Sequence, residues 1–164
     1  MSFETIPPTL THYRVPSEVI VETETFLRMR GKQGHEAVIL WLGHVVDRST
    51  GEITSAYAPQ QLARRSEAGV SVEVTQEGLA VLISALSPGE FVLARVHSHP
   101  GEAYHSDLDD ANLLVSHQGA ISIVVPDFAA DHLNLAECSV NELRHGEGWR
   151  ELRSSEVAER FRVQ

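Results

Sequence analysis

A nearly continuous apolar segment runs from Ala37 to Val46, AVILWLGHVV. A strand with one face in water alternates apolar and polar residues, whereas a strand that is apolar at almost every position is covered on both faces. The segment therefore predicts a central strand with other elements packed on both sides of its sheet. A chain of 164 residues that is 42% hydrophobic can build such a core, and its length predicts a single domain over residues 1–164.

The other elements are predicted from hydrophobic periodicity, capping residues and turn residues. Helices are expected over residues 16–30, from Thr75 to Leu86, over 107–115 and from Ser155 onward, with strands over 37–46, 52–58, 70–74, 91–97 and 120–125. Residues 132–143 and 149–152 are expected to form a hairpin. This order predicts an α/β (α+β) fold, a mixed β-sheet with helices packed on it.

Two of the expected helices have a defined apolar face. In the second helix, four apolar residues stand at helical spacing and are expected to be buried: Leu79, Leu82, Ile83 and Leu86. In the last helix, Val157 and Phe161 are four positions apart and are expected to share a face.

Composition excludes several classes of protein. Acidic residues outnumber basic ones 23 to 13, and the net charge of −10 argues against a nucleic-acid partner, since phosphate binding needs clustered Lys and Arg. Apolar runs fall short of the ~20 residues of a membrane helix, and MSFETIPPTL does not resemble a signal peptide. A cytoplasmic protein without a membrane partner is therefore expected.

The single cysteine, Cys138, excludes an internal disulfide and a zinc site built from several thiolates, and is expected to be structural.

The candidate chemistry begins where the strand 91–97 ends, at His97-Ser98-His99-Pro100. Side chains two apart on a strand point to the same face, so both imidazoles can reach one ion, and Pro100 favours an extended His99. Two neutral imidazoles suit Zn²⁺. An isolated H-x-H pair is also compatible with two merely polar histidines.

A carboxylate follows within reach. Ser106 and Asp109 lie three apart, on one face of the helix expected there, although the same pattern fits a helix cap closed by Ser106. Together with the histidine pair, Asp109 completes a set of two histidines and one carboxylate. Such a set leaves a fourth tetrahedral position for water, as in catalytic zinc sites.

The run HSHPGEAYHSDLD resembles the signature of the JAMM (MPN+) zinc metalloproteases, and Glu36 before AVILWLG matches the family's upstream glutamate. The resemblance implies a cytidine deaminase-like architecture and one zinc ion per chain, held by His97, His99 and Asp109. It implies that Glu36 is the general acid/base for attack by a zinc-bound water and that Ser106 stabilises the oxyanion. The segment between His99 and Ser106 has six residues, one fewer than is common in the family, so Asp110 stays an alternative third ligand.

The resemblance also implies a substrate, a ubiquitin-like protein or its conjugate, cut at the isopeptide or peptide bond after a C-terminal glycine. Relatives of ubiquitin-activating and -conjugating enzymes are possible partners. Two alternatives stay open. One is a peptidase that processes a sulfur-carrier or precursor tail, and the other is a non-catalytic MPN scaffold.

Overall fold

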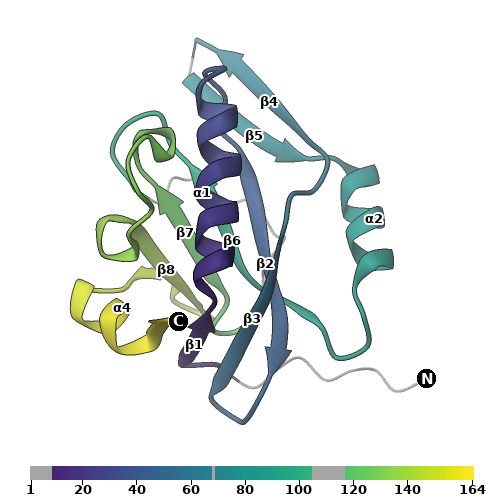
Figure 1. Cartoon of the computed structure of the whole chain (residues 1–164), viewed down its shortest axis with the longest axis vertical. Helices are drawn as coiled ribbons and strands as arrows, with labels where there is room; N and C mark the ends of the chain where they lie inside the picture. Colours follow the sequence, from purple (N-terminus) through teal and green to yellow (C-terminus); the bar gives the residue numbers. More distant parts are fainter. Residues whose placement is uncertain (1–8, 68, 105–116) are drawn as a thin grey trace.

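The computed structural model describes residues 9–67, 69–104 and 117–164, and its main feature is one eight-stranded mixed sheet (Figure 1). The strands are β1 (His12–Val15), β2 (Val38–Val45), β3 (Thr50–Tyr57), β6 (Phe91–Ser98), β7 (Ile121–Val125), β8 (Ser139–Arg144), β9 (Gly148–Glu151) and β10 (Phe161–Val163). Their order is β10-β1-β3-β2-β6-β7-β8-β9. The pairs β1/β10, β1/β3 and β6/β7 are parallel, and the other neighbours are antiparallel.

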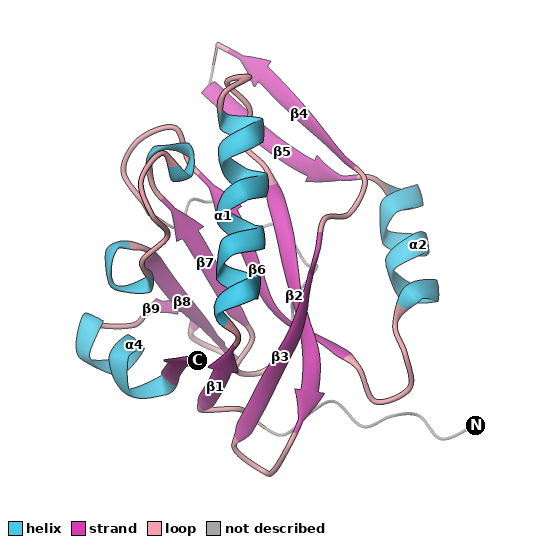
Figure 2. Ribbon diagram, in the orientation of Figure 1, coloured by secondary structure: helices cyan, strands magenta, loops and turns pink. Residues whose placement is uncertain are grey.

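Three α-helices are present in the described part of the chain (Figure 2). They are α1 (Ser17–Gly31), α2 (Gln76–Ala85) and α4 (Ser154–Arg160). Two short 3₁₀ turns, η1 (Asp127–Ala129) and η2 (Leu135–Glu137), lie between β7 and β8. The strands β4 (Gln61–Ser66) and β5 (Gly69–Val74) pair only with each other and form a ribbon beside the main sheet. The expected α/β (α+β) fold is therefore confirmed.

The strand β2 is covered on both faces, as its uninterrupted apolar sequence predicted. Ile39 and Trp41 belong to the larger core, which α1 covers with Val19 and Leu27. Val38, Leu40 and Leu42 point the other way, into a second cluster that includes Leu82 of α2. The alternation along β2 places α1 and α2 on opposite faces of the sheet.

Several sequence predictions are wrong at the periphery. Neither β1 nor β4 was expected, and residues 132–138 precede the hairpin strand β8 instead of forming part of it. Phe161 begins β10 instead of ending the last helix, although it is buried together with Val157. On α2, Leu79 and Ile83 are 40% and 64% exposed, because the helix lies at the edge of the smaller cluster and buries only one side.

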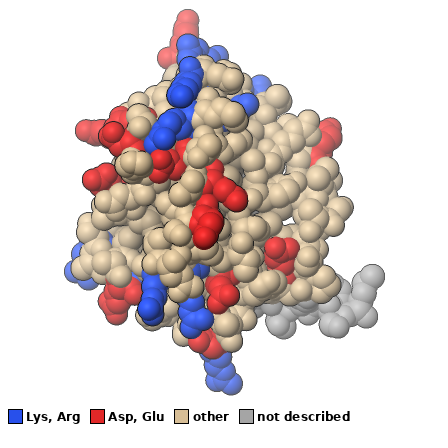
Figure 3. All heavy atoms as spheres, in the orientation of Figure 1, with Lys and Arg blue, Asp and Glu red and all other residues tan. Residues whose placement is uncertain are grey.

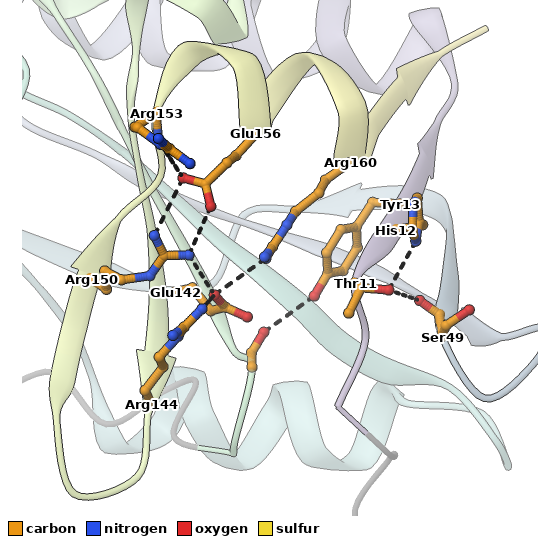
Figure 4. A network of polar contacts seen from close by, with 11 residues as sticks. Thr11, His12, Tyr13, Ser49, Glu142, Arg144, Arg150, Arg153, Glu156 and Arg160 are labelled. Atoms are coloured by element: carbon orange, nitrogen blue, oxygen red, sulfur yellow. Dashed lines mark hydrogen bonds and ion pairs between the residues drawn. The ribbon is translucent and has the colours of Figure 1, made fainter.

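The C-terminal elements are fastened to the sheet by a buried carboxylate (Figure 4). Glu142 on β8 is paired with Arg144, Arg150 and Arg160 at 3.2–3.6 Å, and Arg150 also binds Glu156 of α4. Removing one partner from such a buried network leaves an uncompensated charge. The network therefore fixes α4 and β10 against the hairpin β8–β9.

Acidic and basic side chains are mixed on the face of the molecule shown in Figure 3. The described part of the chain also contains ion pairs such as Arg28–Glu24 at 2.6 Å and Arg14–Glu52 at 3.3 Å. Among the helices that the structure describes, none is long and apolar enough to cross a membrane.

Candidate metal centre

His97 and His99 lie together at the end of β6. Their ring centroids are 5.1 Å apart, and the two residues are only 2% and 5% exposed. The strand places both side chains on one face because they are two residues apart. The rings of Tyr104 and His99 pack in an edge arrangement, with 4.7 Å between their centroids.

Glu36 is brought to the same place by the pairing of β2 with β6. Val38 is opposite His97 in the antiparallel register, and the register continued by two residues sets Glu36 opposite His99. The backbone N–H of Ala37 donates to the Ser98 hydroxyl at 3.1 Å, and the Ser98 N–H donates to the Ala37 carbonyl at 3.1 Å. Glu36 is 8% exposed, so its carboxyl group belongs to a largely buried site.

A second support holds the start of β2. The Gln61 side-chain amide accepts from the Val38 N–H at 2.8 Å and donates to the Val38 carbonyl at 2.9 Å. The pairing of β2 with β3 begins only at Leu40. The Gln61 amide therefore bonds the N–H and the carbonyl of Val38, which β3 does not reach. Sequence reasoning missed Gln61, and also Ser98, because neither residue carries a local signal for a contact made across the sheet.

A buried arginine lies on the same strand as the histidines. Arg95 is 1% exposed, donates to the Ser122 hydroxyl at 2.9 Å and lies over the Trp149 ring at 5.6 Å from its centroid. The sequence assigned Trp149 to the hairpin, and the structure confirms that position on β9. Arg95 itself was not predicted as part of the site's surroundings.

Three sequence-predicted residues, Ser106, Asp109 and the alternative Asp110, lie outside the described residues. Within residues 9–67, 69–104 and 117–164, no group of three His, Cys, Asp or Glu side chains is placed to hold a metal ion. His97 and His99 are chemically suited to bind such an ion, because two buried imidazoles at the end of one strand offer two nitrogen ligands. The assignment of the third ligand stays a prediction.

Cys138 is not part of this site. Its thiol donates to the Asn134 carbonyl at 3.3 Å, and burial together with nearby Glu137 raises the pKa of the thiol to about 12. A nucleophilic cysteine needs a lowered pKa, which favours the reactive thiolate. These contacts agree with the structural role predicted for Cys138.

Known proteins resemble this chain in sequence and in fold. No protein-family model matches the chain. A solution structure of protein DSY2949 from Desulfitobacterium hafniense shares the fold, with a TM-score of 0.59 and 17% identity over 93% of this chain and 92% of that one. A protein of Sinorhizobium fredii (strain NBRC 101917 / NGR234), named probable metalloprotease y4jG, is 35% identical over 142 residues, which cover 86% of this chain and 87% of that protein. The chain therefore belongs to the same metalloprotease family as this relative.

Proposed function

We propose that the chain is a zinc-dependent peptidase of the JAMM type that cuts the peptide or isopeptide bond after the C-terminal glycine of a ubiquitin-like protein. The observation that carries the proposal is the reciprocal bonding of Ala37 and Ser98. It sets Glu36 beside the two histidines, although Ala37 and Ser98 are 61 positions apart in the sequence. Membership of a metalloprotease family supports a metal-dependent peptidase in general.

In this proposal His97, His99 and Asp109 hold one zinc ion. A bound zinc ion lowers the pKa of water to about 7, which makes a nucleophile available at neutral pH. The two imidazoles contribute neutral nitrogen ligands, and the carboxylate of Asp109 contributes one negative charge. The burial of both rings limits competition from solvent for the ligand positions.

Glu36 performs the proton transfers. Its carboxylate takes the proton that the attacking water loses and delivers it to the leaving amine. Ser106 donates a hydrogen bond to the oxyanion that develops on the scissile carbonyl. Ser98 takes no part in the chemistry, but its two bonds to Ala37 fix the distance between Glu36 and the histidines.

The substrate class rests on the resemblance to JAMM proteases and on steric reasoning. A site that activates water attacks many amides, so selectivity has to come from how the scissile bond is delivered. An extended tail that ends in glycine pairs with a strand edge through backbone hydrogen bonds and presents no side chain near the metal. A scaffold function is less consistent with two buried histidines beside a buried glutamate.

The test is cleavage of a panel of ubiquitin-like proteins fused to a reporter, with the products identified by mass spectrometry. We expect cleavage directly after the terminal glycine in the presence of zinc and none after chelation. His97→Ala is expected to abolish cleavage, and His12→Ala, at an exposed histidine on β1, serves as the matched control. Cleavage of linear fusions but not of an isopeptide-linked conjugate favours the precursor-processing alternative. A wild-type protein that neither binds zinc nor cleaves favours the scaffold.

A further inference from the structure

The backbone after β7 is strained at three consecutive residues. Asp127, Phe128 and Ala129 have φ angles of 52°, 54° and 56°, and none of them is glycine. We call these residues the left-handed turn. Residues other than glycine rarely adopt this backbone conformation, and such strain persists only where surrounding contacts impose it. The contacts of the turn therefore indicate what it is for.

The turn is bonded to the segment that follows the two histidines. The Phe128 N–H donates to the His99 carbonyl at 2.8 Å, and the Asp127 N–H donates to the Gly101 carbonyl at 2.9 Å. The His99 N–H in turn donates to the Val125 carbonyl at 2.9 Å. Both backbone polar groups of His99 are thus held by residues 125–128. The left-handed conformation turns two successive N–H groups toward that segment.

Helix α1 holds the turn from the other side. Arg28 donates from Nε to the Ala129 carbonyl at 3.0 Å and from Nη2 to the Asp131 carbonyl at 3.1 Å. Gly31, the last residue of α1, lies so close that a Cβ built there would be 2.3 Å from the Phe128 Cβ and 3.0 Å from the Phe128 carbonyl oxygen. The end of the helix and the turn therefore fit only when residue 31 has no side chain.

We propose that the left-handed turn positions His99, and that contacts with the C-terminal end of α1 hold the turn in its conformation. The proposal rests on the function proposed above and adds residues that no part of the metalloprotease motif contains. Gly31 and Phe128 act through the backbone of His99 and contact neither the proposed metal nor the substrate. Residues that orient metal ligands typically change metal affinity 10–100-fold when they are altered.

The test is a single and a double substitution at the contact between Gly31 and Phe128. Gly31→Ala puts a methyl group against Phe128, while alanine is itself favoured over glycine in a helix, so a loss reports the contact. We expect at least tenfold weaker zinc binding, measured by competition with a chromophoric chelator, and an altered visible spectrum of the Co²⁺-substituted protein. Gly31→Ala/Phe128→Gly removes the opposing Cβ and is expected to restore most of both properties.

Gly51→Ala is the matched control. A Cβ at Gly51 would lie 3.0 Å from Leu10 and 3.1 Å from Leu93, so it crowds the core. Gly51 is paired with Val45, at the opposite end of β2 from the residue paired with His97. We expect it to lower thermal stability without changing zinc affinity. Equal zinc affinity and an unchanged Co²⁺ spectrum in Gly31→Ala overturn the proposal, as does a double variant that remains as weak as Gly31→Ala. A wild-type chain without zinc affinity overturns the proposed function instead.

If Gly31→Ala does not fold, amide hydrogen exchange in the wild-type protein tests whether the turn is coupled to His99. A turn coupled to His99 is stabilised when zinc binds, because coupling is reciprocal. We expect zinc to slow exchange at the Asp127 and Phe128 amides and to leave the Glu147 amide, bonded to Arg144 in the β8–β9 hairpin, unchanged. Zinc binding without slower exchange at residues 127 and 128 contradicts the proposal.

Discussion

Ser98 and Ala37 exchange two hydrogen bonds, from the Ala37 N–H to the Ser98 hydroxyl and from the Ser98 N–H to the Ala37 carbonyl, each at 3.1 Å. Both residues are fully buried. Each is a direct neighbour of a candidate functional residue, Glu36 on one side and His97 and His99 on the other. The pair therefore links the proposed proton-transfer group to the proposed metal ligands through the backbone.

Ser98→Ala is expected to destabilise the fold, because the buried Ala37 N–H loses its acceptor. An unsatisfied buried donor costs about 1–3 kcal/mol, which chemical denaturation can measure. Ser98→Thr keeps the hydroxyl and is the control, expected to retain more stability and more peptidase activity than Ser98→Ala. Equal stability of Ser98→Ala and the wild type would mean that the hydroxyl is not the partner of Ala37 in solution.

Glu36→Gln is expected to retain zinc and to lose nearly all hydrolysis. The amide preserves the shape of the side chain but cannot accept the proton of the attacking water. General acid–base groups contribute about 10²–10⁴ in rate, so kcat should fall by that factor while the metal content stays at one ion per chain. Turnover close to that of the wild type removes Glu36 from the mechanism.

The central part of the fold was predictable because its signals are local. The uninterrupted apolar run of β2 predicted coverage on both faces, and His97 and His99 are brought to one face by strand periodicity alone. β1 alternates exposed and buried residues, but four residues are too few for that pattern to stand out.

The supports of the site have no local signal. Ser98 meets Ala37 only because β2 and β6 pair. The left-handed turn contains Asp127, Phe128 and Ala129, and the sequence DFA has no glycine to indicate positive φ angles. Contacts between distant segments impose these features, so they become visible only when the sheet is assembled.

The proposed third zinc ligand is tested by comparing two neighbouring aspartates. Asp109→Ala is expected to lose most bound zinc, because two imidazoles alone leave the ion without its anionic ligand, whereas Asp110→Ala is expected to keep about one ion per chain. Elemental analysis after dialysis against a weak chelator measures both. The reverse pattern would place the ligand at Asp110 and show that the six-residue segment before Ser106 shifts the register.

Glu24 on α1 is expected to make stability depend on pH. Burial opposes ionisation of its carboxyl group, but the Leu133 N–H and the Arg28 guanidinium outweigh that effect and lower the pKa below the usual value. A carboxyl group with a lowered pKa in the folded state stabilises the protein above its unfolded pKa, about 4.3, and this contribution is lost as the pH falls through the folded value.

Glu24→Gln should therefore lower the melting temperature at pH 7, and the difference from the wild type should shrink near pH 3. Glu22→Gln, at an exposed position on the same helix, is the control and is expected to show little difference at either pH. A constant difference between Glu24→Gln and the wild type across this range contradicts the linkage.

The proposed requirement for glycine before the cut tests how a substrate reaches the metal site. In the proposed mechanism, a tail that lies along a strand edge would bring its last carbonyl to the zinc, and a side chain next to that carbonyl would meet the closely packed surroundings of His97 and His99. Replacing the glycine before the cut with leucine, in a ubiquitin-like fusion that the enzyme accepts, should lower kcat/KM at least a hundredfold. Alanine at the same position should have an intermediate effect, because one methyl group obstructs the approach less than an isobutyl group.

The comparison needs both fusions to remain folded, which circular dichroism of the substrates checks. If the leucine fusion is cut as fast as the glycine fusion, the surroundings of the metal do not select the tail, and a general metallopeptidase describes the protein better.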